Sequence, residues 1–142
     1  MNPETLLTYV RYRTTLAREA MDVAMSALKD GHLHSAVNRL YYACFYMVSA
    51  LLFAEGHASS KHSGIRSLFN RYWIKTGRLP VEMSSFYRDL FNHRQQGDYD
   101  DFVDFTIDDV RAWREQADAF VAHISAEIER LLSTAAGGGE TS

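Results

Sequence analysis

The sequence predicts an all-α protein, an up-and-down bundle of four to five helices. Apolar residues recur at spacings of three and four along most of the chain, and no stretch alternates apolar and polar residues as a half-buried strand does. The only two prolines, Pro3 and Pro80, stand where helices can begin. The 142 residues suffice for one hydrophobic core but not for two. We therefore expect one helical domain over residues 1–134 and a flexible tail over 135–142.

The composition is that of a globular protein, with 46% hydrophobic and 23% charged residues. The formal charge of −3 excludes an overall positive field that would bind any phosphate backbone, but it allows a local basic patch. Cys44 is the only cysteine, which excludes a disulfide framework and a cysteine-rich zinc module. The N-terminus shows no basic region followed by an apolar run, so we expect a cytoplasmic protein, and we expect no cofactor.

The first helix is predicted over about residues 3–29, where an apolar stripe recurs every three or four residues and Asp30-Gly31 forms a C-terminal cap. The second is predicted from about His34 to Glu55 and contains the longest apolar run, residues 40–54. A membrane-spanning helix needs about 20 predominantly apolar residues, and this run is shorter. We therefore expect a buried helix of a soluble bundle and no membrane span.

The second helix carries two stripes of residues at helical spacing, one of them small and apolar and the other aromatic and polar. Two stripes predict two burial partners, the bundle core and a second protomer, so we expect a homodimer. Aromatic residues at this spacing are usually packing, and this remains an alternative to binding. The apolar stripe is Ala36, Leu40, Ala43, Met47, Ala50 and Ala54, and the aromatic stripe is Arg39, Tyr42, Tyr46, Ser49 and Phe53.

Three helices complete the predicted bundle. The third is capped by Ser59 or Ser60 and ends near Gly77, and the fourth follows the second proline. Residues 93–105 lack a helical period and predict a loop of roughly ten residues, and ordered loops of this length are often functional. The last helix begins at Thr106, whose hydroxyl can cap it.

Arg39 and His62 are the polar residues that need an explanation. Arg39 lies at the edge of the aromatic stripe and needs an anionic partner, for which Asp98, Asp100 and Asp101 are candidates. His62 stands at the start of the third helix, where an imidazole and free amides would bind an anion, or where it would cap the helix. The histidines near this point lack the spacing of metal ligands, so we expect no metal site.

Three segments carry a resemblance to a known family: residues 35–46 (SAVNRLYYACFY), 60–65 (SKHSGI) and 94–99 (RQQGDY). In order, spacing and residue type they resemble the HEPN superfamily, in particular a branch of small stand-alone prokaryotic proteins. The resemblance covers the chain from about Leu6 to Leu132 and implies a HEPN-like helical bundle that forms homodimers. It also implies a minimal nucleotidyltransferase encoded nearby and, in several members, a toxin that cleaves RNA without a metal.

The resemblance also implies a nuclease motif, an arginine followed after a short gap by a histidine. Arg94 matches the arginine, which would stabilise the phosphate in the transition state. Tyr99 stands where the histidine belongs, and a phenol with an ordinary pKa of about 10 is a poor general base at neutral pH. Some nucleotidyltransferase partners adenylylate a tyrosine near this motif. Tyr99 is a candidate although Asp101 holds the matching position, and the alternative is that Asp98 and Tyr99 anchor the loop.

We therefore predict a non-catalytic or weakly active HEPN protein of a toxin–antitoxin-like module, which binds a nucleotide, RNA or a partner nucleotidyltransferase. The alternatives are a metal-independent ribonuclease toxin with Arg94 and Tyr99 as its catalytic residues, and a structural helical dimer. The residues predicted to bind are Asn38, Arg39, Tyr42, Tyr46, Lys61, His62 and Asp98.

Overall fold

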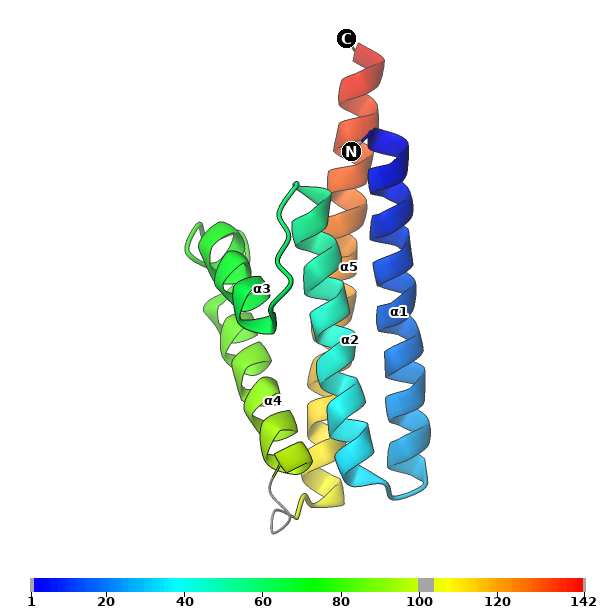
Figure 1. The fold of residues 1–142 in the computed structure, drawn as a ribbon, viewed down its shortest axis with the longest axis vertical. Helices are drawn as coiled ribbons and strands as arrows, with labels where there is room; N and C mark the ends of the chain where they lie inside the picture. Colours follow the sequence, from blue (N-terminus) through cyan, green and yellow to red (C-terminus); the bar gives the residue numbers. More distant parts are fainter. Residues whose placement is uncertain (1, 100–103, 142) are drawn as a thin grey trace.

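The computed structural model describes residues 2–99 and 104–141, and helices account for nearly all of them (Figure 1). No strand occurs in these two ranges, so the predicted all-α bundle is confirmed. The elements are α1 (Pro3–Lys29), α2 (Leu33–Ala54), α3 (His62–Phe69), a π-helical segment η1 (Asn70–Ile74), α4 (Val81–Tyr99) and α5 (Ile107–Thr141).

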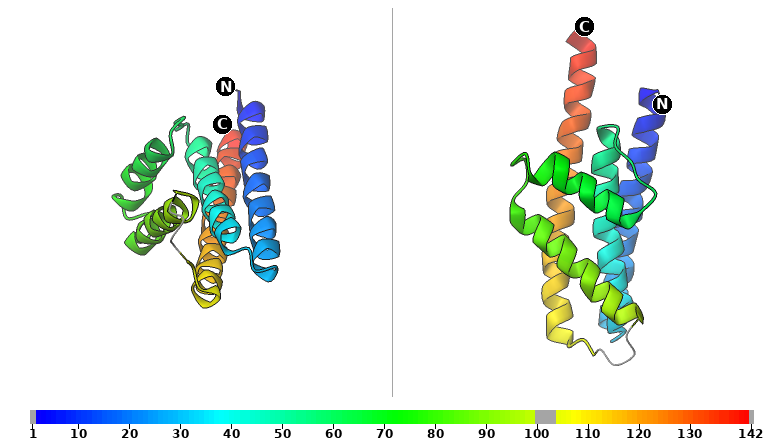
Figure 2. Two further views of the ribbon diagram at one scale, coloured as in Figure 1. Left: turned by 60° about the horizontal axis from the view of Figure 1, so that its bottom comes forward. Right: turned by 60° about the vertical axis from the view of Figure 1, so that its left-hand side comes forward.

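Helix α2 lies at the centre of the bundle. It packs against α1 and α5, which run beside it for most of its length, and it also contacts α3 and α4 on its other side (Figures 1 and 2). The connection after α2 turns back along the helix, so that α3 begins beside the middle of α2 (Figure 1). This return path positions the candidate site, because it brings the start of α3 onto the aromatic residues of α2.

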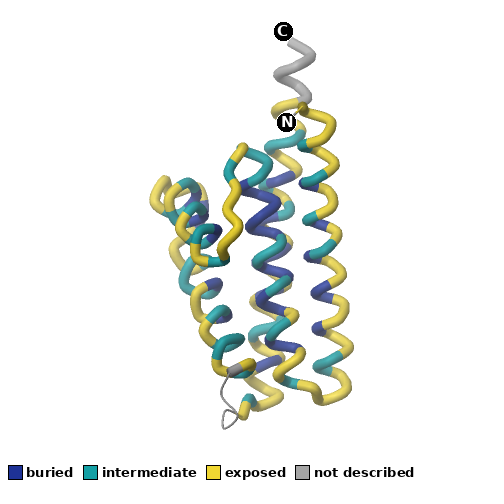
Figure 3. Tube along the Cα trace, in the orientation of Figure 1, coloured by how far each residue is buried: buried dark blue, intermediate teal, exposed yellow. Residues whose placement is uncertain are grey.

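The burial of α2 explains its apolarity. Within the described chain it is the one helix long and apolar enough to cross a membrane by length and composition, yet 72% of its apolar window is buried inside the bundle (Figure 3). The predicted apolar stripe is confirmed as core, with Leu40, Met47 and Ala50 at most 1% exposed. The aromatic stripe is only partly covered, since Tyr42 and Tyr46 remain half-buried.

Capping residues set the predicted helix ends. The side chain of Asn2 accepts a hydrogen bond from the Thr5 amide at 2.8 Å at the start of α1. Gly31 and Gly56 follow α1 and α2 with φ of 79° and 85°, left-handed conformations that glycine adopts readily. At the start of α5 the hydroxyl of Thr106 accepts from the Asp109 amide at 3.1 Å, as predicted.

The third helix differs from the prediction at both ends. It begins at His62 with Lys61 in the cap position and has no side-chain cap, while the Ser59 hydroxyl instead accepts from the amide of Lys61 at 3.2 Å. From Asn70 the helix widens to the π-helical turn η1, in which the amide of Lys75 donates to the Asn70 carbonyl at 2.8 Å. The wider turn shifts the spacing by one residue, which a search for a regular period misses.

The predicted loop at residues 93–105 was wrong in its first half, because α4 continues to Tyr99. Gly97 and its polar neighbours hide the helical period in the sequence. Gly97 is explained by packing, since a Cβ there would stand 2.8 Å from Cε2 of Phe105. Asp100 and Asp101 lie outside the described residues. At the C-terminus α5 extends to Thr141 through the predicted tail, whose flexibility stays a prediction.

Candidate functional site

Arg94 is an arginine of the site whose guanidinium is fixed by several contacts. It lies in the last turns of α4, and its side chain is 14% exposed. Its Nε lies 3.1 Å from Oδ2 of Asp98, and its Nη2 donates to the Tyr42 hydroxyl at 3.4 Å. The guanidinium carbon stands 5.5 Å and 5.2 Å from the ring centres of Tyr41 and Tyr42. One carboxylate and two aromatic rings therefore fix the guanidinium in place.

Tyr42 is the residue on which two arginines and a histidine converge. The guanidinium carbon of Arg39 lies 5.7 Å from its ring centre, and the His62 ring meets it edge to face with centres 5.7 Å apart. Together with Arg94, this places groups from α2, α3 and α4 around one aromatic ring. Two guanidinium groups, those of Arg39 and Arg94, therefore meet at this ring on a negatively charged chain, and Asp98 is paired with one of them.

Arg39 had three candidate partners in the sequence, of which only Asp98 lies within the described residues. Asp98 pairs with Arg94 instead, and its Oδ2 also accepts a hydrogen bond from the Asn38 side chain at 3.0 Å. The physical reason is the helical course of α4, which sets Asp98 one turn beyond Arg94 and makes an i, i+4 ion pair. Arg39 itself is exposed and lies against Tyr42, so its guanidinium stays accessible to an anion from solution.

His62 joins the site from α3 through Tyr41. Its Nδ1 lies 2.9 Å from the Tyr41 hydroxyl, and its ring packs against Phe45 with ring centres 4.1 Å apart. Burial and the positive charge of Arg94 lower the pKa of His62 from its ordinary 6.5. The imidazole is therefore mainly neutral at pH 7.

Tyr41 links the two halves of the site. It is 1% exposed, faces the Arg94 guanidinium and binds His62. Burial raises the pKa of its phenol to about 12, so the hydroxyl keeps its proton near neutrality. Sequence reasoning missed Tyr41 as a site residue, although its position directly before Tyr42 in a helix that buries two faces was the available signal.

The aromatic surface continues from Tyr42 toward α1. The rings of Tyr42 and Tyr46 have centres 5.7 Å apart, and the Arg13 guanidinium carbon lies 5.8 Å from the ring centre of Tyr46. Arg13 is held there by the Tyr9 hydroxyl, which accepts hydrogen bonds from its Nε and Nη2 at 3.1 and 2.8 Å. A half-buried stripe of tyrosine and arginine thus extends beyond the site.

Most of the predicted site residues come together in the structure: Asn38, Arg39, Tyr42, Tyr46, His62, Arg94 and Asp98. Lys61 is exposed beside His62, and no contact joins its side chain to this cluster within the described residues. Tyr99 is the last residue of α4, and its side chain lies outside the described part. Its predicted roles in catalysis, modification and anchoring therefore stay predictions.

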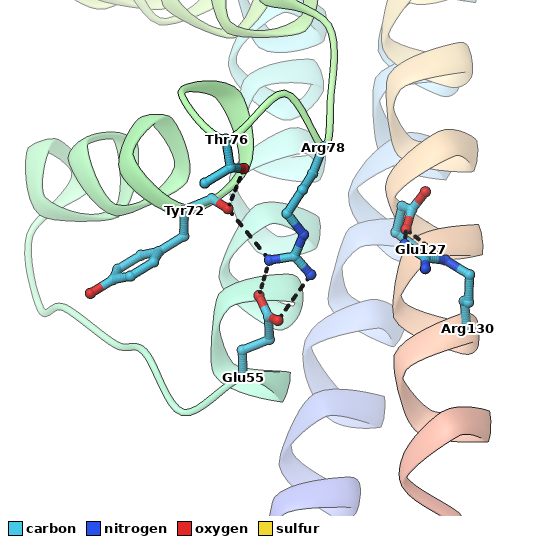
Figure 4. A network of polar contacts seen from close by, with 6 residues as sticks. All are labelled: Glu55, Tyr72, Thr76, Arg78, Glu127 and Arg130. Atoms are coloured by element: carbon cyan, nitrogen blue, oxygen red, sulfur yellow. Dashed lines mark hydrogen bonds and ion pairs between the residues drawn. The ribbon is translucent and has the colours of Figure 1, made fainter. Parts of the chain in front are cut away.

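A second polar network fixes the arm formed by α3 and η1 at its other end (Figure 4). Arg78, after η1, donates from both Nη atoms to the carboxylate of Glu55 at 3.0 Å. Its guanidinium carbon lies 3.4 Å from the ring centre of the buried Trp73, and Nη1 also reaches the Tyr72 carbonyl at 3.4 Å. The arm is therefore attached to α2 both at His62 and at Arg78.

The remaining groups with reactive or metal-binding side chains do not form a second site in the described residues. Cys44 is fully buried, and burial raises the pKa of its thiol well above the ordinary value, so the thiol keeps its proton and is a poor nucleophile. Across the described ranges, no three histidine, cysteine or acidic side chains are grouped closely enough to hold a metal ion. The chemistry of the site therefore rests on Arg94, His62 and the tyrosines.

The fold and the site define a small all-α protein that gathers an arginine and a histidine on the tyrosine-rich face of its central helix. The family model of the HEPN domain matches residues 10–129. The chain belongs to the HEPN family.

Three known proteins are similar in sequence to this chain. A UPF0332 protein of Thermotoga maritima is 47% identical over 128 residues, which cover 90% of this chain and 95% of the relative. Two proteins of Methanocaldococcus jannaschii, MJ0142 and MJ0605, are named as candidate toxins. MJ0142 is 34% identical over 59% of this chain and 57% of its own length. MJ0605 is 25% identical over 82% of this chain and 87% of its own length.

Proposed function

We propose that this protein is a toxin-like HEPN protein whose Arg94 site binds the phosphate of RNA or of a nucleotide, with no catalysis or only weak activity. The observation that carries the proposal is the convergence of Arg94, Arg39 and His62 on the ring of Tyr42. Guanidinium groups bind phosphate with directed hydrogen bonds, and the half-buried rings of Tyr42 and Tyr46 leave part of an aromatic surface for the stacking of bases. The candidate-toxin names of two relatives support a toxin-like role.

The binding test uses fluorescence anisotropy with a short labelled single-stranded RNA and with a labelled ATP. Arg94→Ala is expected to weaken binding about tenfold or more, because a charge-assisted contact to phosphate is lost. The matched control is Arg88→Ala, also on α4, because Arg88 is 59% exposed and pairs with its neighbour Asp89 outside the site. Equal binding by wild type and Arg94→Ala, or no binding of either probe, contradicts the proposal.

The proposal includes a second copy of the chain and a minimal nucleotidyltransferase as partners. The half-buried aromatic stripe on α2 supports a homodimer, because Tyr46 and Phe53 are incompletely covered by the chain's own helices. Light scattering is expected to give the mass of a dimer for the wild type and of a monomer for Tyr46→Glu. Co-expression with a nucleotidyltransferase encoded nearby is expected to give a complex that copurifies, and a protein that elutes alone contradicts the partnership.

A further inference from the structure

A groove between α4 and α5 lies apart from the Arg94 site. Helix α4 crosses α5 at a slant (Figure 2, right), and an open cavity of about 470 Å³ lies between the two helices. Its lining comes from residues 81–93 of α4 and from Trp113 and Gln116 of α5. Arg94 and His62 do not line it, so a ligand of the groove is separate from a phosphate at Arg94.

The walls of the groove are aromatic and held by packing. The indole of Trp113 stacks on the His93 imidazole, with ring centres 4.0 Å apart and an angle of 15° between the ring planes. Phe86 packs on the buried ring of Phe120 with centres 5.8 Å apart, and the fully buried Leu90 adds an apolar surface. Trp113 and Phe86 are themselves half-buried, so each keeps part of its ring surface for a ligand.

The groove carries negative charge. Glu82 and Asp89 are both exposed there, and no lysine or arginine of the described chain lines the cavity. The carboxylate of Glu82 makes no ion pair or hydrogen bond with the described residues. Asp89 lies 3.3 Å from the Arg88 guanidinium, but both side chains are more than half exposed, so water screens this pair and makes it weak. The groove therefore attracts a cation.

The spacing of the two carboxylates selects an elongated ligand. Glu82 and Asp89 are seven residues apart on one helix, which is two turns or about 10 Å along the axis. A single ammonium ion reaches one carboxylate only, whereas an aliphatic chain with an amine at each end spans both. A metal ion does not fit, because no three histidine, cysteine or acidic side chains of the described ranges are grouped closely enough to hold one.

An aliphatic polyamine also matches the aromatic walls, because methylene groups pack on rings and the adjacent positive charge is attracted to the ring faces. We propose that the groove between α4 and α5 binds a linear polyamine such as spermidine, with its end ammonium groups at Glu82 and Asp89. Its methylene chain lies against Phe86 and Trp113. Gln116, whose amide oxygen is an acceptor, serves the inner amine.

The test follows the two tryptophan indole N–H signals by NMR while spermidine is added to the full chain at low salt. Trp113 lines the groove, whereas Trp73 is 0% exposed and lies in the core. The Trp113 signal is expected to shift saturably, and the Trp73 signal is expected to stay in place as an internal control. The variant Trp113→Phe identifies the signals, because it removes one of the two.

Charge variants then locate the bound amine. Glu82→Gln and Asp89→Asn are each expected to weaken spermidine binding about fivefold or more, because one charge-assisted hydrogen bond is lost. Both side chains are exposed, so the variants are expected to fold. The matched control is Glu19→Gln, an exposed acid of α1 outside the groove, which makes the same change of net charge. Ethylenediamine, which is too short to reach both carboxylates, is expected to bind more weakly by a similar factor.

Three results would overturn the proposal. The first is a Trp113 signal that does not shift, and the second is an equal loss of affinity in Glu19→Gln, which indicates attraction to the net charge alone. The third comes from a tetralysine peptide titrated in parallel, if it shifts the Trp113 signal and spermidine does not, because the groove then takes a basic protein segment. Each of these results leaves the proposed phosphate site untouched, since the groove shares no residue with the Arg94 site.

Discussion

Asp98 and Arg94 face each other one turn apart on α4, with Nε 3.1 Å from Oδ2. The same oxygen accepts a hydrogen bond from Asn38 on α2 at 3.0 Å. Asp98 therefore joins two helices and at the same time neutralises the cation that we propose binds phosphate. A ligand phosphate and the Asp98 carboxylate compete for one guanidinium.

Replacing Asp98 by asparagine is expected to strengthen phosphate binding. Asp98→Asn removes the competing negative charge, and the amide keeps an oxygen that can accept from Asn38. We expect the affinity for labelled RNA to rise several-fold and its salt dependence to steepen, because Arg94 then contributes a full charge. Anisotropy titrations at two salt concentrations measure both effects. Unchanged affinity would show that Asp98 does not oppose binding.

Tyr41 and Tyr87 provide a matched pair of buried phenols. Tyr41 is hydrogen-bonded to His62, whereas the hydroxyl of Tyr87, at 2% exposure, lies near that of Tyr41 but makes no hydrogen bond of normal geometry within the described residues. Tyr41→Phe is expected to lower the free energy of unfolding by about 1 kcal/mol, the net value of one hydrogen bond. Tyr87→Phe is expected to leave it unchanged or to raise it. Urea unfolding of the two variants tests the difference, and equal losses would contradict it.

Gly64 is expected to reject even a methyl group. A Cβ there would stand 2.0 Å from Oγ and 2.8 Å from Cβ of Ser59. Alanine normally stabilises a helix by up to about 1 kcal/mol over glycine, but here Ser59 must move, and its hydroxyl loses the hydrogen bond from the Lys61 amide, which costs about 1 kcal/mol or more. Gly64→Ala should therefore lower the thermal midpoint and displace the connection before α3. The double variant Gly64→Ala with Ser59→Gly is the control, and it should recover the loss.

The stability of the domain is expected to fall in mild acid because of His62. Its folded pKa lies below 6.5, so the unfolded chain takes up a proton first as the pH falls. The free energy of unfolding therefore decreases from about pH 6.5 down to the folded pKa and is unaffected above that window. The Glu129 carboxyl, whose pKa is lowered by its hydrogen bond with Arg11, adds to this loss of stability only when the pH falls below the ordinary pKa of 4.5.

Denaturant midpoints across this pH range check the effect of His62. His62→Gln should remove the part of the slope between pH 6.5 and the folded pKa, while the loss at lower pH remains. A slope that is the same in the variant would assign it to other groups.

The fold was largely predictable because helical spacing and cap residues are local signals. The bounds of α1 and α2 follow from apolar stripes that end at Gly31 and Gly56. The end of α4 could not be predicted, because an isolated glycine such as Gly97 suggests a turn. Only the structure shows that the ring of Phe105 packs against Gly97 and accounts for the glycine. The η1 segment was missed for a related reason, since tertiary packing decides where one turn widens.

The site residues were predictable as a set but not as a network. Arg94 and His62 stood out by residue type, yet Asp98 was only one of three candidate partners of Arg39, and its ion pair with Arg94 was not predicted. The role of Tyr41 depends on the return of the chain after α2, which sets His62 beside it. Contacts between elements of this kind follow from three-dimensional placement and leave no mark on local spacing.

The double attachment of the α3–η1 arm divides the domain into parts that can open separately. Breaking the contact of His62 with Tyr41 frees only the start of α3, because Arg78 still binds Glu55 at the far end. The amides of the first turn of α3 are therefore expected to exchange with solvent through a local opening of low free energy, while the buried Trp73 stays packed. Opening at the start of α3 therefore depends on the contact of His62 with Tyr41, whereas the attachment of the far end of the arm depends on the ion pair of Arg78 with Glu55.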